Sequence, residues 1–306
     1  MDLPAWIPIT VAAALFQAWR TALQANLRHD LSASGAAFVR YLYALPLDLL
    51  LLGMAWWFFQ PSAWGLSPEL ILLCLAGGIS QIFGTFFLIS AFGHRNFVVG
   101  TAYAKTEAVQ LILISVLIFG ISLPPLAIVG AVGAMVGVLW LSIPVERLTL
   151  GSWLRASGQP AALFGLGAGL SFALTALFLR EASLTLDAQL PVLFKALLIL
   201  LITNSLQTVV QGGYMARFER PQLRQCLIVW RRAAPVGALS ALGSAAWFTG
   251  FALTQVALVR GLGQIEVVFT LLFGHFFLRE HFQRREVFGL ILVAAGVLVI
   301  ALASLA

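Results

Sequence analysis

The sequence is poor in charged residues and in cysteine, and both shortages narrow the class of protein. Only 10% of the 306 residues are charged, whereas soluble domains average about 25%. The two cysteines, Cys74 and Cys226, are too few for a disulfide framework and lack the spacing of a metal site. The composition therefore excludes an ordinary soluble domain and a disulfide-rich secreted protein. We expect no metal and no cofactor.

Several motifs of enzymes and energy-coupling domains are also absent. No G-x-x-x-x-G-K-[ST] sequence occurs, and the longest polar connections, about 144–159 and 212–232, are too short for a domain that hydrolyses ATP. Work done by the protein must therefore draw on gradients of solutes or ions. The H-E-x-x-H and G-x-S-x-G motifs are missing as well, which disfavours an intramembrane enzyme.

Long apolar runs dominate what is present. Hydrophobic residues make up 61% of the chain, and the mean hydropathy is +0.97. Runs of about 20 apolar residues match the thickness of the hydrocarbon core. We predict an all-α polytopic membrane protein with ten transmembrane helices, at about 5–27, 35–58, 69–92, 96–118, 124–143, 160–180, 189–211, 233–255, 258–278 and 286–305.

The two halves of the chain repeat one pattern of residues. A shift of 159 residues carries Glu107 onto Glu266, and it also aligns three glycines of each half: Gly84 with Gly243, Gly130 with Gly289, and Gly137 with Gly296. Five spans per half is an odd number, so residues 1–145 and 158–306 are predicted to be two inverted five-helix repeats. Gly133-x-x-x-Gly137 and the Gly289/Gly296 pair also predict close helix contacts.

The distribution of arginine predicts the orientation of the chain. Twelve arginines fall in the connections after the odd-numbered spans, and only Arg180 and Arg260 fall in those after the even-numbered spans. The positive-inside rule then places both termini outside the cell. We expect a multi-pass protein of the plasma membrane, the bacterial inner membrane. The net charge of +6 belongs to these short connections, so it does not indicate a nucleic-acid partner.

Two glutamates near the middle of apolar spans are the strongest functional signal. Insertion of one such charge costs about 2.5 kcal/mol or more, and intramembrane charges usually pair or face water. Depth along the spans suggests the pairs Arg40–Glu107 and Lys195–Glu266, facing a central cavity. The pairs would bind substrate, and either glutamate could also carry protons. The alternative is that they only hold helices together.

Other polar residues predict the wall of that cavity. On a continuous helix, Tyr103, Glu107 and Gln110 share one face, whereas Lys105 is about 200° from Glu107 and is expected to turn toward Gln81 or the interface. The remaining wall is predicted from Gln17, Gln81 and Trp247.

A second group of polar residues is more ambiguous. Asn204, Gln207 and Gln211 form a stripe that suits either an exit vestibule or a seam of interhelical hydrogen bonds. Asp48, the only aspartate within a span, has no expected partner beyond a contact with Arg20.

The end of each half resembles a known family. Leu278-Arg279-Glu280 precedes the glycines of the last span, and Leu123-Pro124-Pro125 precedes Gly130 and Gly137 in the first half. This pattern is similar to the ten-span EamA-type members of the drug/metabolite transporter superfamily. The sequence departs from many relatives because it carries charges, not proline, in the middle of spans 4 and 9. The family is also commonly drawn with both termini in the cytoplasm.

The leading functional hypothesis is a secondary active transporter working by alternating access. A cavity with both signs of charge suits small zwitterionic or amphipathic metabolites or drugs, proton coupling is feasible, and the resemblance favours export. An alternative is a flippase for a lipid-linked or nucleotide-linked sugar, because Arg20, Arg40, Lys105 and Lys195 suit anionic cargo. An intramembrane enzyme and a passive channel are weaker alternatives. The expected partners are a small-molecule substrate and the lipid bilayer, with the chain a monomer or a homodimer.

Overall fold

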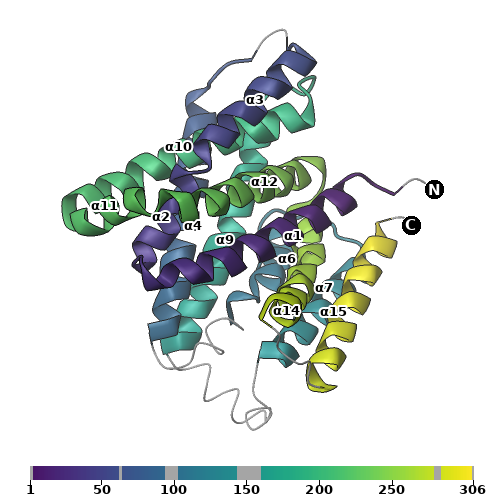
Figure 1. Ribbon diagram of the computed structural model, residues 1–306. Coiled ribbons are helices and arrows are strands. Elements are labelled where there is room, and N and C mark those ends of the chain that lie inside the picture. The colour runs from purple at the N-terminus through teal and green to yellow at the C-terminus, as the bar shows by residue number, and fades with distance from the viewer. Residues whose placement is uncertain (1–2, 62–63, 94–102, 143–159, 279–283, 305–306) are drawn as a thin grey trace. The chain divides into compact units, whose positions relative to one another are not determined.

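The described residues fold into a series of helices (Figure 1). The computed structural model describes residues 3–61, 64–93, 103–142, 160–278 and 284–304, and the regular structure within these ranges is helical, as predicted. In chain order the elements are α1 (Trp6–Ala25), η1 (Asn26–His29), α2 (Ala33–Leu42), α3 (Leu45–Phe59), α4 (Pro68–Gly93), α6 (Glu107–Leu117), α7 (Pro125–Ser142), α9 (Pro160–Leu184), α10 (Val192–Phe218), α11 (Arg220–Ile228), α12 (Trp230–Leu253), α13 (Val256–Leu262), η3 (Gly263–Ile265), α14 (Glu266–Leu278) and α15 (Arg284–Ala303).

Many of these helices have the length and composition of membrane spans. Among the described residues, 6 helical segments are long and apolar enough to cross a bilayer, and shorter apolar helices accompany them at Glu107–Leu117, Pro125–Leu141 and Val287–Ala303. The chain is therefore a polytopic helical membrane protein. The total of ten spans stays a prediction, since the start of the span expected at 96–118 lies outside the described residues. The 6 segments are Ala33–Phe59, Pro68–Leu88, Ala162–Leu184, Val192–Phe218, Trp230–Leu253 and Val256–Phe273.

Large apolar side chains on the outside of the helices agree with a hydrocarbon environment. Trp57 and Phe58 at the end of α3 are 72% and 82% exposed, and Leu117 at the end of α6 is 76% exposed. Soluble proteins rarely expose apolar surface so extensively, because water would favour its burial. Lipid acyl chains cover such surface without that cost.

The chain forms two compact units, and neither is a sequential half. The first unit comprises Met1–Ile7, Ser80–Leu174 and Val256–Ala306, and the second comprises Pro8–Ile79 and Thr175–Gln255. Each unit thus combines segments from both predicted repeats, 1–145 and 158–306. The inverted relation between those repeats stays a prediction.

In the first unit, α7 and α15 lie side by side (Figure 1), and glycine allows their close contact. A Cβ on Gly130 would lie 2.7 Å from the carbonyl oxygen of Gly296, and one on Gly137 would lie 2.7 Å from the backbone nitrogen of Val293. The close contact predicted for Gly137 and Gly296 is confirmed. The one predicted for Gly133 is wrong, because no atom lies within 4 Å of its Cβ position.

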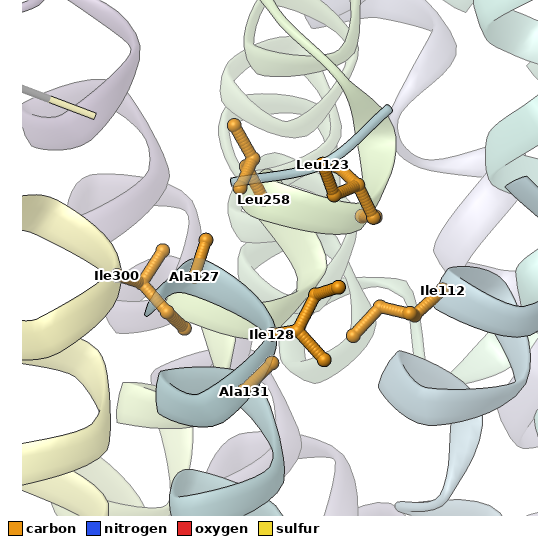
Figure 2. A pocket seen from close by; sticks show the side chains of 8 residues that line it. Ile112, Leu123, Ala127, Ile128, Ala131, Leu258 and Ile300 are labelled. Carbon is orange, nitrogen blue, oxygen red and sulfur yellow. The ribbon is translucent and has the colours of Figure 1, made fainter. Parts of the chain in front are cut away.

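A small apolar pocket lies among α6, α7, α13 and α15 of the same unit (Figure 2). Its lining side chains are all hydrocarbon, so they offer neither a charge nor a side-chain hydrogen bond to a polar solute. The lining residues are Ile112, Leu123, Ala127, Ile128, Ala131, Ala257, Leu258 and Ile300.

In the second unit, α10 packs against α2, α3 and α12, and polar side chains join it to its neighbours. Asn204 Nδ2 donates to Asp48 Oδ2 at 2.7 Å, and Gln207 Nε2 donates to the carbonyl oxygen of Gly78 at 3.0 Å. Gln211 Nε2 donates to the carbonyl oxygen of Ser34 at 2.9 Å. The stripe on α10 is therefore a seam of interhelical hydrogen bonds. The partner of Asp48 in this seam is Asn204.

Cys226 on α11 is buried, and burial makes its thiol unreactive. Its Sγ donates to the carbonyl oxygen of Gly35 at 3.6 Å. Burial, with a smaller contribution from the negative charge of Glu219, raises the pKa of the Cys226 thiol from 9.0 to about 11. The thiolate is the reactive form, so at neutral pH its population falls about a hundredfold. The neutral thiol stabilises the fold below the unfolded-state pKa, and that contribution disappears as the pH rises through about 11.

We therefore expect a maleimide to label folded Cys74→Ala protein very slowly at pH 7, and more than about tenfold faster at pH 9. Labelling in sodium dodecyl sulfate at pH 7 should be rapid, because unfolding exposes the thiol. Mass spectrometry of time points measures both rates. Rapid labelling of the folded protein at pH 7 would contradict the buried position of Cys226.

Candidate functional site

The helix that carries Glu107 is interrupted immediately before that residue. Lys105 and Thr106 form a turn, and α6 begins at Glu107. Thr106 Oγ1 donates to the carbonyl oxygen of Tyr103 at 2.6 Å and accepts a hydrogen bond from Gln110 Nε2 at 2.9 Å. Threonine side chains that bond to nearby backbone groups compete with regular helical hydrogen bonds. The local sequence thus stabilises the interruption.

The helix that carries Glu266 is interrupted at the matching position. Helix α13 ends at Leu262, a short 3-10 segment spans Gly263–Ile265, and α14 begins at Glu266. Both glutamates therefore stand in the first turn of a helix, where the partial positive charge of the helix N-terminus favours a carboxylate. Discontinuous helices of this kind form the binding sites of many secondary transporters.

Each glutamate forms an ion pair with a cation from the other half of the chain. Arg260 Nε lies 3.1 Å from Glu107 Oε1, and Lys105 Nζ lies 3.3 Å from Glu266 Oε2. The Arg260 and Glu107 side chains are only 15% and 16% exposed. The four side chains all belong to the first unit. Their formal charges cancel, so the cluster is neutral as a whole while presenting both signs of charge.

Helix α9 closely approaches the interruption before Glu107. A Cβ on Gly169 would lie 2.9 Å from Gln110 Nε2 and 3.1 Å from the carbonyl oxygen of Ala104. The same amide nitrogen of Gln110 donates to the carbonyl oxygen of Leu166 at 3.3 Å. Only glycine at 169 permits this approach without displacing the neighbouring groups. Helix α9 therefore forms one wall beside the turn at Lys105 and Thr106.

The partners of the two glutamates differ from those expected from the sequence. Glu107 pairs with Arg260 instead of Arg40, and Glu266 pairs with Lys105 instead of Lys195. On a continuous helix, Lys105 and Glu107 would lie on different faces. The turn at Lys105 and Thr106 interrupts the helix and allows both residues to join one cluster.

The predicted cations Arg40 and Lys195 lie in the second unit. The Arg40 guanidinium lies 5.4 Å from the centre of the Tyr41 ring. Lys195 near the start of α10 is only 8% exposed. Their role in substrate binding stays a prediction.

The structure brings together two of the predicted wall residues of the second unit. Trp247 Nε1 donates to Gln17 Oε1 at 3.0 Å, and the Trp247 ring stacks on Phe251 with centroids 6.0 Å apart. The other two, Gln81 and Tyr103, are half-buried in the first unit. Lining of a substrate path by these four residues stays a prediction.

Arg260 is the site residue that sequence reasoning missed. The arginine count places it in an external connection, because it stands at the start of the predicted span 258–278. The structure places it within α13, six residues before Glu266 and beside Glu107. Two features of the sequence indicate Arg260 as a site residue. It falls inside the predicted span, and two glycines that favour a helix interruption follow it, in Gly261-Leu262-Gly263.

The fold and the site define a polytopic helical membrane protein. Four of its charged residues form a cluster at two matched helix interruptions. Residues 159–302 match the EamA-like transporter family. That family is part of the drug/metabolite transporter superfamily, so the match confirms the resemblance seen in the sequence. The match indicates a membrane transporter of this kind, and it points to a non-enzymatic function.

Comparison with solved structures shows that other proteins share this fold. The chain matches 28 chains of solved structures. One of them, described as "Crystal structure of protein", superposes with a TM-score of 0.72 over 98% of this chain and 97% of its own, at 15% sequence identity. At this identity the likeness concerns the fold alone. None of the curated proteins compared with the sequence matches it.

Proposed function

We propose that the protein transports a small zwitterionic or amphipathic organic solute by alternating access, driven by a solute or proton gradient. The supporting observation is the neutral cluster of Glu107, Arg260, Lys105 and Glu266 at two helix interruptions. A solute that carries an ammonium and a carboxylate can exchange partners with these pairs. Its ammonium would bind a glutamate, and its carboxylate would bind Arg260 or Lys105.

The energetics of buried ion pairs support such an exchange. The Coulomb gain of a buried pair is largely offset by the cost of removing both charges from water. Replacing an internal pair by a pair with the solute therefore changes the free energy little. Leaving one charge without a partner costs about 3–5 kcal/mol. The site consequently favours a solute that supplies both charges at once.

Protonation of Glu107 or Glu266 would provide the coupling to a proton gradient. A neutral glutamic acid no longer attracts its cation, so proton uptake and ion-pair formation become alternatives. Movement of the half-helices that begin at these residues would then follow protonation. Export is the proposed direction, on the resemblance to the family.

Reconstitution of the purified chain into proteoliposomes tests this function, with radiolabelled leucine as the zwitterionic probe and tetraphenylphosphonium as the amphipathic one. We expect accumulation of at least one probe that depends on an imposed pH gradient and collapses with a protonophore. Flux that only follows the probe's own gradient would indicate a channel or a uniporter. Absence of flux for both probes would contradict the proposed substrate class.

A flippase for a lipid-linked or nucleotide-linked sugar is a second candidate. Lys195 is a buried cation for which no ion pair is found within the described part of the chain. An anionic phosphate would supply the missing partner. Uptake of a radiolabelled nucleotide sugar by the same proteoliposomes, lost in Lys195→Gln protein, would favour this candidate over the first.

A further inference from the structure

Asp48 is a fully buried carboxyl group in the second unit. It stands in the first turn of α3, and its exposed fraction is 0%. Oδ2 accepts the hydrogen bond from Asn204 Nδ2 at 2.7 Å, whereas Oδ1 has no hydrogen-bond partner among the described residues. The hydrogen-bond seam on α10 uses only one oxygen of this carboxyl group, and the ion-pair cluster belongs to the other unit.

The surroundings of Asp48 within the described residues hold no cation that contacts it. Helices α10 and α12 pack against α3. On α10, Lys195 is nine residues before Asn204, which is about 13 Å along the axis. Arg231 and Arg232 lie in the first turn of α12, where Arg232 pairs with Asp30. A further titratable group, the thiol of Cys74 on α4, lies beside Thr203, the residue that precedes Asn204.

Asp48 therefore differs from the two glutamates of the site. Glu107 and Glu266 each form an ion pair with a cation, whereas Asp48 accepts a hydrogen bond from a neutral amide. A buried carboxylate without a cation loses its hydration and gains no Coulomb attraction in return, so burial favours the protonated acid. The helix N-terminus and the Asn204 amide favour the ionised form. Because these influences oppose each other, the two forms of Asp48 differ little in free energy. A small opening of the α3–α10 contact to water would then be enough for the carboxyl group to release its proton.

We propose that Asp48 is a proton-binding site of the transporter, protonated in this conformation and ionised when the α3–α10 contact opens to water. The step is a simple acid–base equilibrium: the Asp48 carboxylate takes up one proton on closure and returns it to water on opening. This inference rests on the proposed transport function, since coupling requires a solute to be moved. It assigns a proton site outside the cluster of Glu107 and Glu266.

Infrared spectroscopy of the full chain in liposomes tests the protonation directly and needs no substrate. We expect a carbonyl stretching band of a protonated carboxylic acid at neutral pH that disappears at alkaline pH. Cell-free synthesis with carbon-13-labelled aspartate should shift this band in the unaltered protein. The remaining aspartates, Asp2, Asp30 and Asp187, lie outside the predicted spans. A band that is absent, or that does not move with the label, would overturn the proposal.

Variants then connect the band with transport. Asp48→Asn keeps the size of the side chain and an oxygen that can accept from Asn204, so we expect a folded protein without the band. Its pH-gradient-driven accumulation of leucine or tetraphenylphosphonium should fall at least about tenfold, while exchange of labelled for unlabelled probe continues. Glu107→Gln protein should keep the band.

Unchanged gradient-driven accumulation in Asp48→Asn protein would overturn the proposal. A labelled aspartate band in a protein that moves neither probe would contradict the proposed function and leave the proton site supported.

Discussion

Glu107→Gln protein is expected to transport solute at least about thirtyfold more slowly than the unaltered protein, with a similar amount in the membrane. Loss of one partner from a desolvated charge pair costs about 2–5 kcal/mol, and about 1.4 kcal/mol corresponds to a factor of ten. Glutamine keeps the size of the side chain but leaves Arg260 without its carboxylate at 3.1 Å. Initial rates of probe uptake into proteoliposomes measure the effect.

A matched control and a paired variant identify the origin of this loss. Glu69 stands in the first turn of α4 and is exposed, so Glu69→Gln should transport at the unaltered rate. The double variant Glu107→Gln/Arg260→Gln removes both charges of this pair and should restore thermal stability without restoring transport, because the solute then finds only the Lys105–Glu266 pair of the cluster. Normal transport by Glu107→Gln would remove Glu107 from the site. Full recovery of transport in the double variant would reduce the pair to a structural role.

Gly296→Ala protein is expected to lose about 1–3 kcal/mol of stability, the usual cost of overpacking, or more. A Cβ at this position would lie 2.6 Å from the carbonyl oxygen of Gly130. The obstruction is backbone, so no side-chain rotation can relieve it, and α7 and α15 would have to separate. The midpoint of thermal unfolding in detergent, followed by static light scattering or intrinsic fluorescence, measures the change.

Gly133→Ala is the matched control for this substitution, because Gly133 lies on α7 between two contact glycines. No atom lies within 4 Å of its Cβ position, and alanine favours a helix over glycine by about 1 kcal/mol in peptides. We expect an unchanged or slightly raised midpoint. Equal losses for Gly133→Ala and Gly296→Ala would show that the close α7–α15 contact does not determine stability.

The limits of sequence reasoning are visible at Lys105. An unbroken helix would turn Lys105 toward Gln81 or the interface, whereas the structure pairs it with Glu266. The turn at Lys105 and Thr106 depends on the Thr106 hydroxyl, on Gln110 and on the close approach of α9 at Gly169. The Thr106 and Gln110 contacts come from residues close in the sequence, but the approach of α9 comes from a helix far along the chain. The periodicity of the segment around Lys105 contains no information about α9.

The sequence by itself determined the class of the protein, because the shortage of charge, the apolar runs and the spaced glycines act through local properties of each segment. It also singled out Glu107 and Glu266, since a carboxylate in an apolar helix is costly wherever its neighbours lie. The tertiary structure alone decided the partners: Arg260 and Lys105 for the glutamates, and Asn204 for Asp48. Pairing depends on where the backbone is interrupted and on which distant helices pack together, and both result from contacts between segments that a linear pattern does not record.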